Sequence, residues 1–146
     1  MLDDTLLRTD LTIDPVDQEA IKKASAAGIS VMLASGRMMQ SMRPYVELLG
    51  LDLPLIAYNG AIIQEAKSKK VLFHRPVPNE AAVEVLNSFK EAGLHLNAYI
   101  NDQLFMEELT DWGKLYAKNA GVSPHAVGDQ LVELLAKEAS HKLLGL

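Results

Sequence analysis

Two short stretches hold the side chains best suited to chemistry. Asp3-Asp4-Thr5 places two carboxylates and a hydroxyl together, and Ser35-Gly36-Arg37 places a hydroxyl, a glycine and a guanidinium after an apolar run. Carboxylates act as nucleophiles, proton donors or metal ligands. A guanidinium binds an anion through two parallel hydrogen bonds, and a glycine lets the backbone approach a ligand closely. These residue types favour a phosphate-like anion as the ligand.

Each stretch also has a simpler interpretation when it is taken alone. Ser35 can serve only as the cap of the helix expected to begin near Met38, because serine is a common N-cap residue. Asp3, Asp4 and Thr5 can be a solvated chain end. The functional interpretation therefore depends on a fold that brings the two stretches together.

Helical and apolar patterns alternate along the first half of the chain. They predict a helix at 15–28 begun by the Asp14-Pro15 cap, a strand at 29–34, a helix at 38–49, a strand at 54–58, and a hairpin of 61–65 with 71–74. Alternating strands and helices indicate a parallel sheet with flanking helices. Ser35 would then follow the carboxyl end of a doubly buried strand and precede a helix N-terminus, where open α/β sheets bind phosphate.

Arg75-Pro76-Val77-Pro78 resists both helix and central strand, so it is expected to be a linker. After it the pattern restarts with a second set of elements. This set is a helix from an Asn79 cap to Gly93, a hairpin of 94–100 with 103–107, a helix from a Thr110 cap to Gly121, a helix at 131–139 and an apolar run at 142–146. Trp112 and Tyr116, one turn apart, are expected in the core. The predicted division is residues 1–76 and 77–146.

Composition excludes several classes of protein. The formal net charge of -5 and the pI of about 5.3 argue against nucleic-acid binding, which needs a basic face. The sequence has no cysteine, which excludes disulfides and thiolate sites and is consistent with a reducing, cytoplasmic setting. No apolar run approaches the length of a membrane span, so no membrane partner is expected. The four histidines lack metal-ligand spacing.

The motifs, in order, resemble one known family. Asp3-Asp4-Thr5-Leu6-Leu7 resembles the first motif of the haloacid dehalogenase superfamily, and the apolar run ending at Ser35 resembles the second. Ser35-Gly36-Arg37 and Tyr58-Asn59-Gly60-Ala61 are similar to loops of its Cof-type phosphatase branch. The resemblance implies a partial Rossmann-like α/β core in residues 1–76, with a parallel sheet and flanking helices, followed by part of an α/β cap domain in residues 77–146.

The resemblance also implies an activity and residue roles. Family members hydrolyse small phosphorylated metabolites with Mg²⁺ through an aspartyl-phosphate. Asp3 matches the general acid and base, and its backbone carbonyl matches a Mg²⁺ ligand. Thr5 matches the threonine that orders the first loop, and Ser35 matches the phosphate hydroxyl. The residues that match the surrounding phosphate- and substrate-binding loops are Gly36, Arg37, Asn59 and Gly60.

The chain departs from the family pattern at its start and downstream. Met1 stands at the nucleophile position, and the later lysine and acidic motifs are not in this sequence, so the chain is expected to match the N-terminal half of such an enzyme. A phosphate- or anion-binding module without catalysis, or an inactive fragment, is the alternative. A doubly wound domain of the response-regulator kind is a third, although no phospho-acceptor aspartate follows a strand. Exposed sheet edges would also favour self-association.

Overall fold

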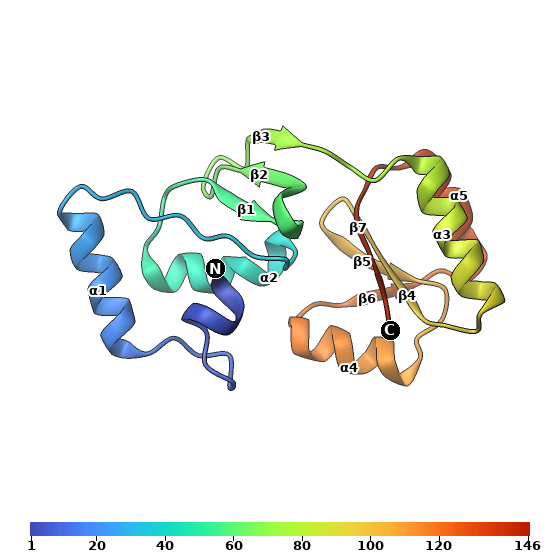
Figure 1. The fold of residues 1–146 in the computed structure, drawn as a ribbon, viewed down its shortest axis with the longest axis horizontal. Helices are drawn as coiled ribbons and strands as arrows, with labels where there is room; N and C mark the ends of the chain where they lie inside the picture. The colour runs from blue at the N-terminus through green and yellow to red at the C-terminus, as the bar shows by residue number, and fades with distance from the viewer. The chain divides into compact units, whose positions relative to one another are not determined.

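The computed structural model describes residues 1–146, with the exception of the Asp4 side chain, which lies outside the description. Residues 1–74 and 75–146 form two compact units, and each is described by itself (Figure 1). The helices are α1 (Pro15–Ala26), α2 (Met39–Leu49), α3 (Asn79–Glu91), α4 (Asp111–Ala120) and α5 (Gln130–Lys137). The strands are β1 (Leu55–Ala57), β2 (Ile62–Gln64), β3 (Val71–His74), β4 (Leu96–Ile100), β5 (Gln103–Met106), β6 (Pro124–Ala126) and β7 (Ser140–Gly145).

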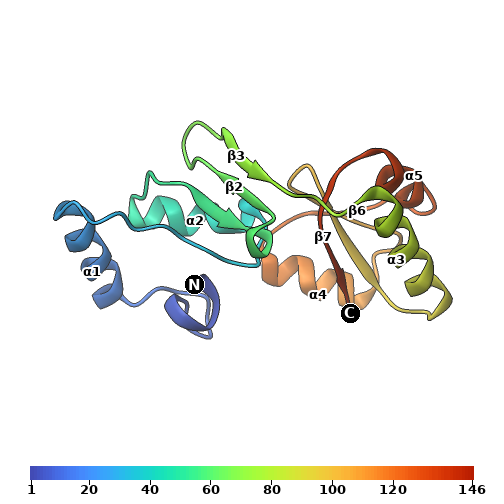
Figure 2. The ribbon, with the colours of Figure 1, turned by 45° about the horizontal axis from the view of Figure 1, so that its top comes forward.

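The first unit contains a three-stranded sheet in the order β1-β2-β3, with both pairs antiparallel. The predicted hairpin of β2 and β3 is confirmed. The Asn-Gly turn after β1 is tight because Asn59 has φ 57° and Gly60 has φ 93°, values in the left-handed region that asparagine and glycine tolerate. Helix α2 runs along one side of this sheet (Figures 1 and 2) and buries Met42, Val46 and Leu49.

The predicted strand at 29–34 is largely wrong. Its only ladder contact is a parallel bridge between Ala34 and Ile56, where the Ser35 amide donates to the Ile56 carbonyl at 2.9 Å. Ile29 is 60% exposed and Met32 is 53% exposed, so the run is not buried on both faces. The physical reason is the length of its neighbour. Strand β1 has only three residues, Leu55–Ala57, and the earliest residue of the run that it contacts is Leu33, whose carbonyl accepts from the Ile56 amide at 3.0 Å. The parallel part of the sheet is therefore confined to this bridge, although the α/β class is confirmed.

Helix α1 begins where the sequence indicates. The Asp14 carboxylate accepts a hydrogen bond from the Val16 amide at 2.8 Å, and Pro15 occupies the first helical position. None of the described side chains of this helix is buried, and Val16 is 74% exposed. Its local capping chemistry, rather than burial, therefore sets its position in the chain.

The second unit contains a four-stranded sheet in the order β6-β5-β4-β7, in which only the β5–β6 pair is parallel. Helices α3 and α5 lie side by side along one face of it (Figure 2). A core of buried aliphatic side chains joins these helices to β4: Ala82, Leu86, Leu96, Ala98, Ile100, Leu131 and Leu135. On the other side of β4, the Tyr99 hydroxyl donates to the Tyr116 hydroxyl of α4 at 2.6 Å.

Several predictions for this unit are confirmed. The β4–β5 hairpin turns at Asn101 and Asp102, both with positive φ, and the Thr110 hydroxyl caps α4 by accepting from the Gly113 amide at 3.1 Å. The strand β6 was not predicted. Its three residues, Pro124–Ala126, are too few to produce a periodic pattern.

Two predictions for this unit are wrong. Asn79 does not cap α3, because the N-cap is Pro78. The side-chain Nδ2 of Asn79 instead donates to the carbonyls of Leu135 and Glu138 at 2.6 and 2.9 Å. These carbonyls lie at the end of α5, where helix carbonyls need partners from outside the helix. Trp112 is 63% exposed instead of in the core, because only Gly113 and Ala117 of α4 are buried.

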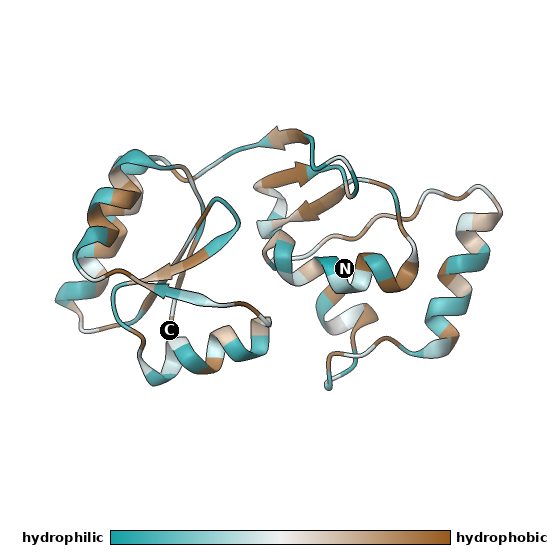
Figure 3. Cartoon of the chain, turned by 180° about the vertical axis from the view of Figure 1, so that it is seen from behind, coloured by the Kyte–Doolittle hydropathy of each residue, from teal (hydrophilic) through white to brown (hydrophobic). Residues whose placement is uncertain are grey.

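Hydropathy differs between the strands of the first unit and the helices (Figure 3). Strands β1, β2 and β3 are largely hydrophobic, whereas the helices alternate between hydrophobic and hydrophilic segments. Strand β3 is the edge of its sheet, and its residues Val71, Leu72 and Phe73 are each 47% exposed. Among the described residues, no helix is long and apolar enough to span a membrane.

Candidate functional site

Backbone hydrogen bonds bring the two predicted stretches together. The Leu2 amide donates to the Ala34 carbonyl at 2.9 Å, and the fully buried Leu2 side chain anchors this contact. Residues Leu2–Leu6 form one π-helical turn, closed by the Leu7 amide donating to the Leu2 carbonyl at 3.0 Å. The turn therefore begins beside the end of the 29–35 segment, and Asp3 lies next to Ser35.

The Asp3 carboxylate is held by both functional side chains of the second stretch. The Ser35 hydroxyl donates to Asp3 Oδ2 at 2.6 Å, and Arg37 Nε donates to Asp3 Oδ1 at 2.7 Å. The Ser35 hydroxyl also accepts from the Arg37 amide at 3.1 Å, so one hydroxyl joins all three residues. We call Asp3, Ser35 and Arg37 the Asp3 corner. Each carboxylate oxygen has a donor of its own, which is the arrangement that two oxygens of a phosphate would require.

The electrostatics of the Asp3 corner favour an ionised carboxylate. Burial raises the pKa of Asp3, but the hydrogen bonds from Ser35 and Arg37 and the charge of Arg37 outweigh it and hold the pKa below its ordinary value. The Asp3 side chain is 40% exposed and that of Arg37 is 18% exposed. The carboxylate is therefore reachable from solvent, while the guanidinium that holds it is mostly covered.

A tyrosine on the following helix also contacts Arg37. The Tyr45 ring lies under the guanidinium, with 5.8 Å from the guanidinium carbon to the ring centroid. This distance is within the range of a cation–π interaction. Tyr45 was not identified from the sequence. One signal in the sequence could have identified it. Tyr45 follows Arg37 by eight residues and lies about two turns into the helix that starts at Met39.

The second predicted loop lies directly against the Asp3 corner. The Asn59 amide donates to the Ser35 carbonyl at 3.2 Å, and the Tyr58 amide donates to the Arg37 carbonyl at 3.0 Å. A Cβ placed on Gly36 would lie 2.5 Å from Asn59 Oδ1, so the asparagine side chain occupies the space that the missing Cβ leaves. Gly60 completes this tight turn. Four of the predicted residues, Ser35, Gly36, Arg37 and Asn59, thus gather around Asp3.

Asp3 and Thr5 open onto a cavity of about 440 Å³. Its lining also includes Arg8, whose guanidinium is ion-paired with Asp14. Thr5 is exposed and lies in the π-helical turn, on the cavity side of the Asp3 corner. Its volume lies within the usual range for small-molecule sites, and Asp3 is the residue of the Asp3 corner that lines it.

The metal prediction rests on the Asp3 backbone carbonyl. Oxygen donors are the ligands that Mg²⁺ prefers, and a backbone carbonyl fits that preference. Among the described side chains, no group of three or more His, Cys, Asp or Glu is placed to hold a metal ion. The described residues therefore supply only part of a magnesium coordination set.

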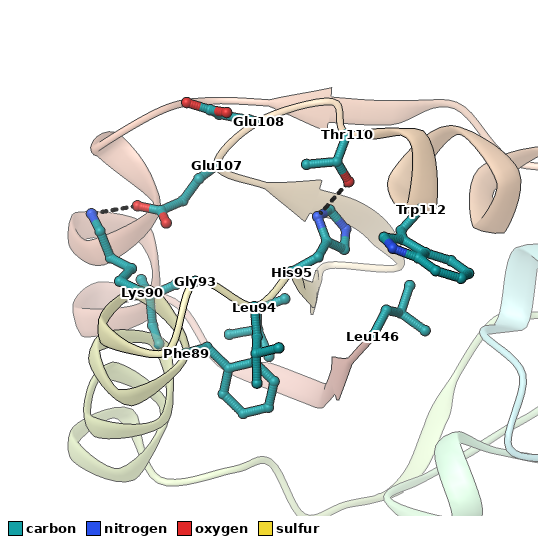
Figure 4. Close-up of a pocket in the computed structure, with 12 residues that line it drawn as sticks. Phe89, Lys90, Gly93, Leu94, His95, Glu107, Glu108, Thr110, Trp112 and Leu146 are labelled. Carbon is teal, nitrogen blue, oxygen red and sulfur yellow. Dashed lines mark hydrogen bonds and ion pairs between the residues drawn. The ribbon is translucent and has the colours of Figure 1, made fainter.

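The second unit has a cavity of its own, of about 410 Å³ (Figure 4). His95 points into it with Nδ1 2.9 Å from the Thr110 hydroxyl, and Lys90 Nζ lies 2.6 Å from Glu107 Oε1. His95 Nε2 lies 2.9 Å from Asn97 Oδ1, so both ring nitrogens have protein partners. The His95 ring is thus part of a local hydrogen-bond network with Thr110 and Asn97.

Comparison with known proteins identifies the family of this chain. A sequence profile of haloacid dehalogenase-like hydrolases matches residues 2–145. This chain belongs to the haloacid dehalogenase-like hydrolase family. The family predicted from the motifs, and its Cof-type branch, are confirmed.

Two curated relatives are phosphatases. The chain is 31% identical over 109 residues to pyridoxal phosphate phosphatase YbhA of Escherichia coli, over 75% of this chain and 40% of that protein. It is 29% identical over 103 residues to 5-amino-6-(5-phospho-D-ribitylamino)uracil phosphatase YwtE of Bacillus subtilis, over 70% of this chain and 35% of that protein. The chain thus spans well under half the length of these relatives.

Solved structures share the fold of nearly the whole chain. The Thermotoga maritima protein TM0651 superposes with a TM-score of 0.83 at 34% identity, over 99% of this chain and 54% of that one. A haloacid dehalogenase-like hydrolase from Bacteroides thetaiotaomicron gives a TM-score of 0.80 at 23% identity, over 90% of this chain and 51% of that one, which supports the fold alone. Both solved chains are about twice as long as the matched segment.

Proposed function

We propose that this chain is the part of a Mg²⁺-dependent phosphatase that holds the proton-transfer and phosphate-binding groups. The observation that carries the proposal is the Asp3 corner, in which one carboxylate, one hydroxyl and one guanidinium meet beside a cavity. The family membership and the two phosphatase relatives support the same reaction class.

In this proposal Asp3 is the general acid and base of phosphate-ester hydrolysis. Because this carboxyl is ionised in the unliganded chain, it has to take up a proton when the phosphate ester binds before it can give one to the leaving oxygen. It later takes a proton from the attacking water, and both transfers need a carboxyl reachable from the cavity. Ser35 binds the transferring phosphoryl group through its hydroxyl. Arg37 and the loop residues Gly36, Asn59 and Gly60 surround that group, and Thr5 orders the first turn. Bound Mg²⁺, held in part by the Asp3 carbonyl, would neutralise phosphate charge.

The proposal also assigns the two units. Residues 1–76 form part of the catalytic core, and residues 77–146 form part of a cap that contributes to substrate choice. The substrate class is a small phosphorylated metabolite, since the named substrates of the two relatives are of that kind and the cavity beside Asp3 measures about 440 Å³.

The direct test is a phosphate-release assay on the protein that carries this segment, using a panel of small phosphate esters with Mg²⁺ and with a chelator. We expect Mg²⁺-dependent release, and we expect Asp3→Asn to lower kcat by roughly 10²- to 10⁴-fold, the usual contribution of a general acid and base. Asp17→Asn, in the exposed first turn of α1, is the matched control and should leave kcat unchanged. Absence of phosphate release across the panel would refute the proposal.

Phosphate binding without turnover is the second candidate function. The observation in its favour is Met1, which stands at the family's nucleophile position and has no oxygen with which to attack phosphorus. In that case the Asp3 corner of this chain would bind inorganic phosphate, yet phosphate esters would remain intact after long incubation.

A further inference from the structure

A groove in the first unit lies between helix α2 and the hairpin of β2 and β3. It has a volume of about 620 Å³, within the usual range for small-molecule sites. Its lining shares no residue with the Asp3 corner. Any ligand bound there would therefore be additional to the phosphate ester of the proposed reaction, and the inference does not depend on that reaction.

The floor of the groove is apolar. Met39 and Val46 from α2, Leu51 after its end, and Leu55 of β1 line it, and their residues are 3%, 8%, 7% and 4% exposed. These residues are already mostly buried, so each adds only the small apolar area that it still exposes, and covering that area stabilises a ligand in proportion to its size. The floor therefore suits a hydrocarbon or aromatic body and gives no hydrogen bonds to a fully polar ligand.

The rim of the groove is mainly cationic. Arg43 reaches it from α2, and Lys67 and Lys69 reach it from the hairpin tip, whereas Glu47 is the acidic residue in the lining. Lys67 Nζ is paired with Asp52 at 2.5 Å, so Arg43 and Lys69 provide most of the remaining positive charge. This local excess occurs in a chain whose formal net charge is -5. It attracts an anionic group to the edge of an apolar floor.

Hydrogen bonds order the hairpin tip that carries the lysines. Gln64 Nε2 donates to the Lys69 carbonyl at 2.9 Å, the Glu65 amide donates to the Lys70 carbonyl at 2.9 Å, and the Ser68 hydroxyl donates to Glu65. Two lysines of this exposed tip, Lys67 and Lys69, line the groove at fixed backbone positions.

We infer that this groove binds a small amphipathic anion, with its apolar body on the floor and its charged head between Arg43 and Lys69. A medium-chain carboxylate is the simplest molecule of this chemistry. The two requirements are separable, because acetate has the charge without the body and octylammonium has the body with the opposite charge.

The test is an NMR titration of the chain with octanoate, following the backbone amides of Val46, Leu51 and Leu55. We expect saturable shifts with octanoate, little effect of acetate, and weaker binding of octylammonium. Lys69→Glu should lower the association constant for octanoate by about tenfold and raise that for octylammonium, because the head group then meets the opposite charge. Arg43→Glu is a second variant with the same expectation.

Lys22→Glu, on the exposed face of α1, is the charge-matched control and should change neither constant by more than about twofold, since a distant exposed charge is screened. Absent shifts at the floor would overturn the inference, as would equal effects of Lys22→Glu and Lys69→Glu. Octylammonium binding as tightly as octanoate to the unmodified chain would overturn it too. Phosphate shifts at Ser35 should persist in every variant, which separates this inference from the proposed reaction.

Discussion

At the scale of single residues, the Asp3 corner is the feature that the sequence predicted in composition but not in geometry. Asp3, Ser35 and Arg37 could be chosen because their types and order match a phosphate-handling pattern. That Arg37 binds Asp3 could not be predicted, because 34 positions separate the two residues. The backbone contact of Leu2 with Ala34 helps to bring them together, and that contact has no signature in the side-chain pattern.

Removing the guanidinium should raise the pKa of Asp3. In the unmodified chain the hydrogen bond and charge of Arg37 help to hold that pKa below its ordinary value, so Arg37→Ala should move it upward. The measurement is a pH titration of the Asp3 carboxyl carbon by NMR. Arg37→Lys keeps a positive charge and should give an intermediate value. An unchanged pKa in Arg37→Ala would show that the pair does not persist in solution.

The same pair has a defined effect on stability against pH. Because the folded pKa of Asp3 is lowered, its ionised form stabilises the fold above the unfolded value near 3.8, and this contribution is lost as pH falls through the folded pKa. Urea unfolding should therefore show a stability difference between the unmodified chain and Arg37→Ala at pH 7 that shrinks below about pH 3.8. A difference that stays constant from pH 7 to pH 2 would contradict this assignment.

Ser35 should contribute to folding as well as to binding. Ser35→Ala removes the hydroxyl that donates to Asp3 and accepts from the Arg37 amide, and the residue is only 5% exposed. The Arg37 amide and one oxygen of the partly exposed Asp3 carboxylate then lose this partner, which should lower the free energy of unfolding by about 1–3 kcal/mol. Ser30→Ala, at an exposed position nearby, should change it by less than about 0.5 kcal/mol. Equal losses in both variants, measured by urea unfolding, would contradict this role.

At the scale of helices and strands, local signals predicted well wherever capping or turn chemistry decided the outcome. Asp14 and Thr110 cap helices as expected, and Asn101-Asp102 turns the β4–β5 hairpin. Predictions failed where contacts with residues distant in the sequence decided the outcome. The run at 29–34 needed neighbouring strands along its whole length, and Asn79 found carbonyl acceptors on a helix more than fifty residues away.

Asn79 should stabilise the second unit through those carbonyls. Asn79→Ala removes two hydrogen bonds from the end of α5, at Leu135 and Glu138, and should lower the free energy of unfolding by about 1–3 kcal/mol. Asn87→Ala, exposed on the same helix, is the control and should be neutral or slightly stabilising because alanine has the higher helix propensity. If both variants unfold at the same urea concentration, the link between α3 and α5 is not a stabilising one.

At the scale of the whole molecule, the order of motifs was sufficient to predict the family, whereas the surfaces were not predicted. A patterned sequence indicates which residues can be buried, but burial requires a partner surface. Helix α1 carries Ala20, Ile21 and Ala24 at helical spacing and buries none of its described side chains, and Trp112 is likewise exposed. The chain spans 54% of the solved protein TM0651. Its exposed surfaces are therefore those of a segment about half as long as that protein.

The exposed edge of the first sheet should promote self-association of this chain. Strand β3 lies at the edge of its sheet, and Val71, Leu72 and Phe73 are each 47% exposed, a combination that favours pairing with another copy. Analytical ultracentrifugation should show a sedimentation coefficient that rises with concentration. Leu72→Lys should reduce this rise because a charge on an edge strand opposes pairing. A concentration-independent monomer would contradict the prediction.

The measurement that tests the central claim most directly is an NMR titration of this chain with inorganic phosphate, following the amides of Ser35, Gly36 and Arg37. The claim is that the Asp3 corner is a phosphate site, so these amides should shift saturably, and Ser35→Ala should weaken the binding while Ser30→Ala leaves it unchanged. If the three amides do not move, or if Ser35→Ala binds phosphate as well as the unmodified chain does, the Asp3 corner is a structural contact and not a phosphate site.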